Sequence, residues 1–156
     1  MKVINWLDKH FEEYILVILS LLTVVVIFIQ VVMRYLLDSS LVWSEELARY
    51  AFIWMVFIGV SYAVKKQRHI TVDAFALLFN DKGKIVLAMI GNVFFFSFCL
   101  ILAYFGYGVI LKVSRLSPAL EIPLGWIYAA PVVGLILSAI RLIQILYKQV
   151  KELKTL

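Results

Sequence analysis

The hydrophobic pattern divides the chain into four long apolar runs separated by short polar segments. These runs predict membrane-spanning helices at about residues 14–34, 47–64, 85–111 and 124–146, because about 20 apolar residues of helix cross the hydrocarbon core of a bilayer. The connections are too short to hold a second folded unit. The pattern therefore predicts an all-α integral membrane protein, with residues 1–156 forming a single four-helix membrane domain.

The second run is the shortest and carries charge at its start. Its apolar part, between Arg49 and Lys65, is 15 residues and covers roughly 22 Å as a helix. Since the hydrocarbon core is about 30 Å thick, the turn that holds Glu45, Glu46 and Arg49 must lie at its edge or inside it. A carboxylate four residues before an arginine lowers the cost of that position, because the two side chains can meet. Ser44 is the expected N-cap of this helix.

The third and fourth runs differ in their expected shape. Residues 85–111 are 27 residues without a charge, about 40 Å as a helix, so this helix must tilt or extend past the membrane. Pro118 and Pro123 predict that the following connection is an ordered loop rather than a helix. Pro131 is expected to kink the fourth helix.

Small residues mark two faces where helices can approach closely. Gly59 and Ala63 form such a pair on the second run, and the spacing predicts packing within the chain. Ala130, Gly134 and Ser138 recur every four residues on the fourth run. This stripe predicts a second packing face.

The flanks leave two alternatives open. Residues 1–13 have an apolar stripe and form either a short helix in the headgroup region or a mobile polar tail. Residues 70–79 are a second candidate for an interfacial helix. A cleavable signal peptide is not expected, because Glu12 and Glu13 precede a run of about 20 residues and no small-residue cleavage site follows.

The distribution of lysine and arginine predicts the orientation. The N-terminal segment, the connection between the second and third runs and the C-terminal end hold 11 of these residues, and the other two connections hold four. This bias predicts that both termini lie in the cytoplasm. Arg141, near the end of the fourth run, is expected to extend its side chain toward the interface.

Composition supports the membrane assignment. Hydrophobic residues make up 64% of the chain and charged residues 16%, against about 45–50% and 25% in soluble domains. The mean hydropathy is +0.99. The net charge of +5 does not indicate nucleic-acid binding, because the cations lie in short flanks between apolar runs. The lone Cys99 excludes an internal disulfide.

Residues with catalytic or metal-binding potential are sparse. The chain shows no serine–histidine–acid arrangement, glycine-rich phosphate loop or histidine–cysteine cluster, so neither an enzyme nor a cofactor or metal site is expected. His10 and His69 lie in flanks, which disfavours a haem anchor, and Asp73 is interpreted with His69 as part of a solvated loop. Asn92 is expected to bond a neighbouring helix rather than a substrate. No run carries the mid-membrane ionisable site of an independent transporter, which indicates a helper protein.

One polar cluster remains as a candidate site. Gln30 and Arg34, near the end of the first run, could pair with Glu45, Glu46 and Arg49 across a short connection. The cluster is either an internal salt-bridge network that joins two helices or a contact with a partner membrane protein.

The stretches WSEELARY and FIWMVFIGVSYAVKKQRHITVD, with VVMRY before them, resemble the small membrane subunit of tripartite ATP-independent periplasmic (TRAP) transporters, the DctQ-like family. The later stretch IPLGWIYAAPVVG resembles a looser second signature of that family. The resemblance covers roughly residues 14–146. The residues carried over, as subunit-interface or helix-pairing positions, are Arg34, Trp43, Ser44, Glu45, Glu46, Arg49, Gly59 and His69.

The resemblance implies a four-span subunit of the bacterial cytoplasmic membrane that scaffolds a larger membrane subunit. The larger subunit would hold the substrate and sodium sites, and an extracytoplasmic binding protein would deliver an organic acid of the C4-dicarboxylate or sialic acid class. The rival interpretations are a self-contained small multidrug-type carrier and a membrane anchor of a redox enzyme.

Overall fold

The computed structural model describes residues 2–66 and 81–155, and this part of the chain is helical apart from its connections. The helices are α1 (Lys2–Leu36), α2 (Val42–Lys65), α4 (Asp81–Lys112) and α5 (Gly125–Thr155). All four are long and apolar enough to cross a membrane. The all-α prediction with four spans is confirmed, whereas the candidate interfacial helix at 70–79 lies outside the described residues.

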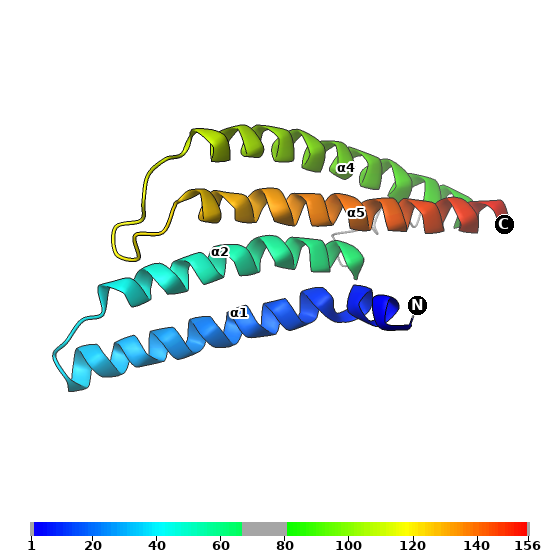
Figure 1. The fold of residues 1–156 in the computed structure, drawn as a ribbon. Coiled ribbons are helices and arrows are strands. Elements are labelled where there is room, and N and C mark those ends of the chain that lie inside the picture. The colour runs from blue at the N-terminus through cyan, green and yellow to red at the C-terminus, as the bar shows by residue number, and fades with distance from the viewer. Residues whose placement is uncertain (1, 67–80, 156) are drawn as a thin grey trace.

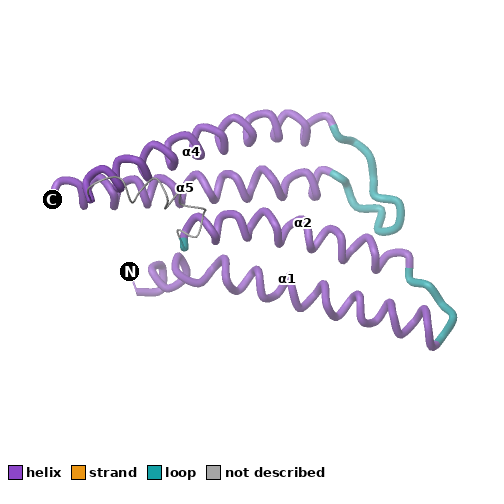
Figure 2. Tube along the Cα trace, turned by 180° about the vertical axis from the view of Figure 1, so that it is seen from behind, coloured by secondary structure: helices purple, strands orange, loops and turns teal. Residues whose placement is uncertain are grey.

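The helices lie in a row rather than in a closed bundle. In the described part of the chain, α1 packs on α2, α2 on α5, and α5 on α4, while α1 and α4 do not pack on each other. Figures 1 and 2 show this order from opposite sides. Both chain termini lie at one end of the long axes of the helices, here called the termini end. The connections 37–41 and 113–124 lie at the opposite end of these axes, the loop end.

The helices extend beyond the predicted spans. α1 already begins at Lys2, so the N-terminal segment is helical and continuous with the first spanning helix, and is not a mobile tail. Extending an existing helix is favourable, because each added residue gains a hydrogen bond without a new nucleation cost. α5 likewise runs through Pro131 as one helix and continues past the predicted end at residue 146.

The expectation that Ser44 is the N-cap of α2 is wrong. The helix begins two residues before Ser44, at Val42, and Leu41 precedes it without a side-chain cap. The Ser44 hydroxyl instead donates to the carbonyl oxygen of Leu41 at 2.6 Å. Ser44 is fully buried, so its hydroxyl is satisfied locally in the first turn rather than by an exposed helix end.

The small-residue stripe of α5 forms a close contact with α2. Ala130 and Ser138 are fully buried, and a Cβ added at Gly134 would lie 2.5 Å from the carbonyl oxygen of Phe57 on α2. The stripe therefore lets two backbones meet, as predicted. Gly59 differs, because a Cβ there would lie 3.9 Å from a Leu16 methyl group of α1, at ordinary contact distance.

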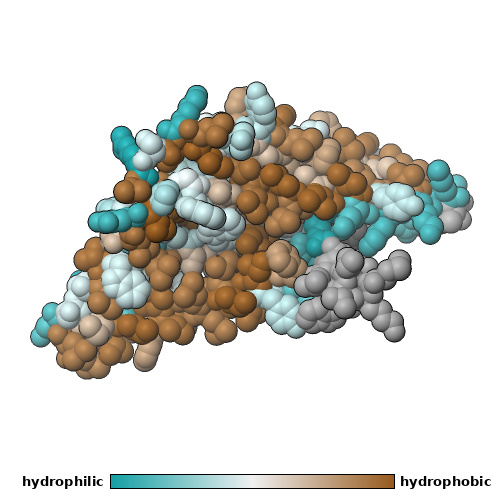
Figure 3. Space-filling view, viewed as in Figure 1, coloured by the Kyte–Doolittle hydropathy of each residue, from teal (hydrophilic) through white to brown (hydrophobic). Residues whose placement is uncertain are grey.

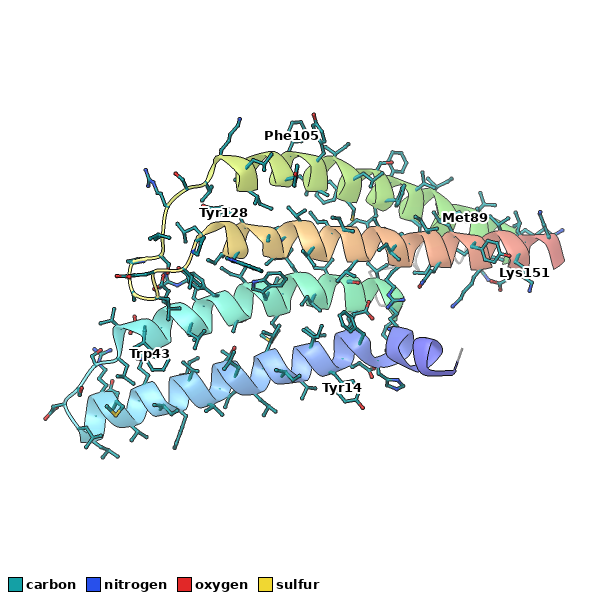
Figure 4. The ribbon with its side chains drawn as sticks, in the orientation of Figure 1. Tyr14, Trp43, Met89, Phe105, Tyr128 and Lys151 are labelled. Atoms are coloured by element: carbon teal, nitrogen blue, oxygen red, sulfur yellow. The ribbon has the colours of Figure 1, made fainter. Side chains whose placement is uncertain are left out.

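The outer helices expose most of their apolar surface. Figure 4 shows Phe105 on the side of α4 away from α5 and Tyr14 on the side of α1 away from α2, and both side chains are more than half exposed. In Figure 3 an apolar middle separates hydrophilic residues at the two ends. This distribution fits a layer whose middle is covered by lipid or by another membrane protein.

Candidate functional site at the two ends of the helix layer

At the loop end, Glu46 of α2 holds the connection between α4 and α5. One carboxylate oxygen accepts hydrogen bonds from the backbone N–H groups of Ala119 and Leu120, at 2.8 and 2.9 Å. The other oxygen accepts a hydrogen bond from the hydroxyl of Tyr50. Glu46 is buried, so it acts as a fixed acceptor that joins two parts of the chain 73 residues apart.

The connection has a shape that suits this acceptor. Residues 113–124 form a small hairpin in which Ser117 N–H donates to the Ile122 carbonyl at 2.9 Å and Leu124 N–H donates to the Arg115 carbonyl at 3.0 Å. Glu121 takes the left-handed conformation, with φ 54°, which tightens the turn. The N–H groups at the tip thereby remain available to the Glu46 carboxylate. The ordered loop predicted from Pro118 and Pro123 is confirmed.

The rest of the predicted cluster is only partly assembled. Gln30 of α1 donates to Glu45 of α2 at 2.6 Å, which joins these two helices. Arg34 is exposed and lies 6.0 Å from the ring of Tyr35, and Arg49 is also exposed. Within the described residues neither arginine forms an ion pair, so the cluster joins helices through hydrogen bonds rather than through a salt-bridge network.

Two further residues of the predicted site remain, Trp43 and His69. Trp43 is partly exposed in the first turn of α2. His69 lies outside the described residues.

At the termini end, a second buried carboxylate joins three helices. Glu12 of α1 is fully buried and accepts hydrogen bonds from Lys65 Nζ of α2 at 2.6 Å and from Arg141 Nε of α5 at 2.7 Å. Arg141 Nη2 reaches its other oxygen at 3.2 Å, and the Ser61 hydroxyl adds a contact at 3.1 Å. Both carboxylate oxygens are therefore satisfied by residues of α2 and α5.

The expectation that Arg141 extends to the interface is wrong. Its side chain is buried, and Nη1 donates to Gln144 at 2.9 Å in addition to the contacts with Glu12. A buried charge is tolerated when an opposite charge and hydrogen bonds replace its hydration, and Glu12 supplies both. Hydropathy alone could not reveal the pair, because Glu12 and Arg141 are 129 residues apart. The only signal was an unmatched acid at the start of one run and an unmatched base near the end of another.

Two further contacts lie beside the pair of Glu12 and Arg141, both at Glu13. The Tyr62 hydroxyl donates to Glu13 at 2.6 Å, and Lys66 lies 3.3 Å from the same carboxylate at the surface. Its hydrogen bond with Glu13 raises the pKa of the Lys66 ammonium above its ordinary value.

On the other side of the layer, Asn92 of α4 donates to Gln149 of α5 at 3.0 Å. The prediction that Asn92 bonds a neighbouring helix is confirmed.

The chemistry available at both ends is that of joining helices. Among the described residues no group of three or more acidic, histidine or cysteine side chains is placed to hold a metal ion. The buried polar side-chain atoms in the same part of the chain all have hydrogen-bond partners. Both ends therefore fix the relative positions of helices.

Comparisons with known proteins place this chain in a family. The family model of the tripartite ATP-independent periplasmic transporters, DctQ component, matches residues 23–152. A TRAP transporter small permease protein of Haemophilus influenzae is 30% identical over 138 residues, which cover 87% of this chain and 85% of the relative. The ectoine TRAP transporter small permease protein TeaB of Halomonas elongata is 28% identical over 153 residues, which cover 96% of this chain and 78% of that protein.

A longer relative matches over only part of its length. The sialic acid TRAP transporter permease protein SiaT of Haemophilus influenzae is 32% identical over 145 residues, which cover 92% of this chain but 23% of that protein. Membership of a TRAP system implies a large membrane subunit as partner, which in some relatives is fused to the small one. With four candidate spans and a family match over most of its length, the chain belongs to the DctQ family and is a small permease subunit of a TRAP transporter, a transport protein and not an enzyme.

Proposed function

We propose that this subunit is the stationary scaffold of a sodium-driven TRAP importer of an organic acid and has no substrate site of its own. The observation that carries the proposal is the open layer of helices. Its buried polar groups join its own helices, while its apolar faces are left for another surface to cover. Such a layer is suited to bracing a neighbour in the bilayer.

The proposed partners are the large membrane subunit and an extracytoplasmic binding protein. The large subunit would cover part of the exposed apolar surface of the layer, because close packing between complementary helix faces drives helix association in lipid. The proposed helix-pairing residues are those carried over from the sequence. They are Arg34, Trp43, Ser44, Glu45, Glu46, Arg49 and Gly59, with His69 on the connection outside the described residues.

The proposed cargo is an organic acid of the C4-dicarboxylate or sialic acid class, selected by the other subunits. Relatives of similar identity carry different solutes in their names, sialic acid at 32% and ectoine at 28%. This spread supports a small subunit whose sequence does not set the solute.

The proposed orientation places both termini in the cytoplasm and the loop end outside. It rests on the bias of lysine and arginine toward the termini end. Single cysteines at Ser40 and Lys154, in a Cys99→Ser background, test it. An impermeant maleimide applied to intact spheroplasts should label S40C and spare K154C. The reverse pattern would overturn the orientation without affecting the family assignment.

The scaffold role is tested by reconstitution of the transporter. Proteoliposomes with the large subunit, the binding protein and this chain should take up the acid in response to an inward sodium gradient, and omission of this chain should abolish uptake. Undiminished uptake without it would contradict the proposal. Arg141→Met, which disrupts the termini end, should lower uptake by the full complex, while Lys66→Gln serves as the surface control.

Each of the two rival functions has its own test. A self-contained carrier needs an ionisable group that can exchange its proton or ion, and the buried Glu12 is instead fully occupied by Lys65, Arg141 and Ser61. Accumulation of a solute by proteoliposomes that contain only this chain would restore the carrier hypothesis. A haem absorption band from the purified chain would restore the redox anchor.

A further inference from the structure

An apolar groove lies between α4 and α5 near the termini end. It has a volume of about 350 Å³, and no polar surface lines it. Its walls are Val86, Met89, Ile90, Val93 and Phe94 of α4 and Leu153 of α5. Figure 4 shows Met89 beside α5 in the half of the layer that carries Lys151. The groove is open to the surroundings, so a flexible chain can enter it from the side.

The depth of the groove matches the upper part of an acyl chain. Its α4 residues lie within the first ten residues of the charge-free stretch that starts at Ile85, just inside the boundary between headgroups and hydrocarbon. The hydrogen bond between Asn92 and Gln149 joins α4 to α5 at this level and holds the two helices together beside the groove. The groove is therefore a feature of the packed helix pair.

Positive charge lies near the groove along both helices. Lys82 lies four residues before Val86 and so shares its face of α4, while Lys154 follows Leu153 on α5. Both lysines are exposed. Lys151 adds a further positive charge to the last turns of α5.

The balance of charge at this end stays positive. Lys82 and Lys84 on α4, with Lys151 and Lys154 on α5, carry four positive charges, and Asp81 and Glu152 among them carry two negative charges. Basic side chains beside a cleft between membrane helices attract anionic headgroups. The charge complements a phosphate, and the apolar walls complement its acyl chain.

We propose that this groove binds one anionic phospholipid. One acyl chain fills the space between α4 and α5, and the phosphate lies between Lys82 and Lys154. A zwitterionic lipid can fill the same apolar space but gains less from the lysines, because its own cation offsets its phosphate. A soluble phosphate compound lacks the acyl chain and so loses the contribution of the groove. The site is independent of the proposed scaffold role.

Native mass spectrometry of the delipidated subunit in detergent tests the proposal. The probe is an equimolar mixture of phosphatidylglycerol and phosphatidylcholine with identical acyl chains. The wild-type chain should retain one phosphatidylglycerol several-fold more often than phosphatidylcholine. Glycerol phosphate, which has the headgroup chemistry alone, should not be retained. Equal retention of the two lipids, or retention of glycerol phosphate, would overturn the proposal.

Two variants separate the groove from net charge. Lys82→Gln with Lys154→Gln should abolish the preference for phosphatidylglycerol, whereas Lys112→Gln with Arg115→Gln removes the same charge from exposed residues at the loop end and should preserve it. Met89→Trp fills the groove without a change of charge and should reduce retention of both lipids. An equal loss in the two double variants would show that net charge alone attracts the lipid, and the proposal would fail. Circular dichroism and the elution volume in detergent verify that each variant is folded.

Discussion

Among the described residues, each end of the helix layer holds one buried carboxylate, but the partners of the two groups differ. Glu12 at the termini end meets the ammonium of Lys65 and the guanidinium of Arg141, whereas Glu46 at the loop end meets two backbone N–H groups and the hydroxyl of Tyr50. One end is thus held by opposite charges on three helices. The other is held by the backbone of a loop.

This difference predicts that the two ends have different roles in the fold. Removing one partner of a buried ion pair leaves a charge without compensation, which is among the most costly changes in a folded protein. Removing an acceptor from a loop instead releases N–H groups that can turn toward water. We therefore expect the termini end to control the stability of the layer and the loop end to control the conformation of residues 113–124.

Arg141→Met should have the largest effect. It leaves Glu12 buried with Lys65 as its remaining cation, and the free energy of unfolding in detergent should fall by about 3–5 kcal/mol. Denaturant titration followed by circular dichroism measures this change. The double variant Glu12→Leu with Arg141→Met should recover most of the loss, because no buried charge is left unpaired at Glu12. A double variant as unstable as the single one would contradict the assigned role of the pair.

Gly134→Ala tests the contact on which both ends depend, the close approach of α2 and α5. Its Cβ would lie 2.5 Å from the carbonyl oxygen of Phe57, so the two backbones must separate. We expect a loss of about 1–3 kcal/mol in the same titration, typical of overpacking. Gly59→Ala is the matched control, because its Cβ has ordinary spacing from Leu16 and should be tolerated. If the two variants lost the same free energy of unfolding, the close approach of α2 and α5 at Gly134 would be contradicted.

Glu46→Gln should have a local effect at the loop end. The glutamine amide oxygen can still accept from the N–H groups of Ala119 and Leu120, but it carries no charge, so both hydrogen bonds weaken. Hydrogen exchange followed by mass spectrometry should therefore show faster exchange in the peptide that covers residues 117–122. Exchange near Glu12 should stay unchanged. If both ends loosened together, they would not be independent.

Lys66→Gln should have the smallest effect. The pair with Glu13 is exposed and 3.3 Å long, and exposed ion pairs contribute little to stability. The pKa of Lys66 is raised, so any contribution of its charge is complete below the ordinary value of 10.5 and is lost only as the pH rises through the raised pKa. At pH 7 the free energy of unfolding should equal that of wild type within error, while Lys65→Gln should lower it.

The amino-acid sequence by itself determined the helical character, the four spans and the family. About 20 apolar residues in a row can satisfy their backbone only as a helix in lipid, so span positions follow from local composition. The small-residue stripe of α5 and the role of Asn92 were also predictable, because helix periodicity decides which side chains share a face. Spacing also predicted that Glu45 and Arg49 meet on one face of the second helix. In the structure, Glu45 instead accepts a hydrogen bond from Gln30, and Arg49 is exposed.

Only the tertiary structure decided which helices are neighbours. The order α1, α2, α5, α4 brings Arg141 to Glu12 over 129 residues and the tip of the 113–124 loop to Glu46 over 73. A span can pack beside any other span without changing its own hydropathy, so such pairings leave no periodic trace in the chain. They arise because a buried charge or N–H group must find a partner inside the folded layer, and the helix order decides which partner it finds.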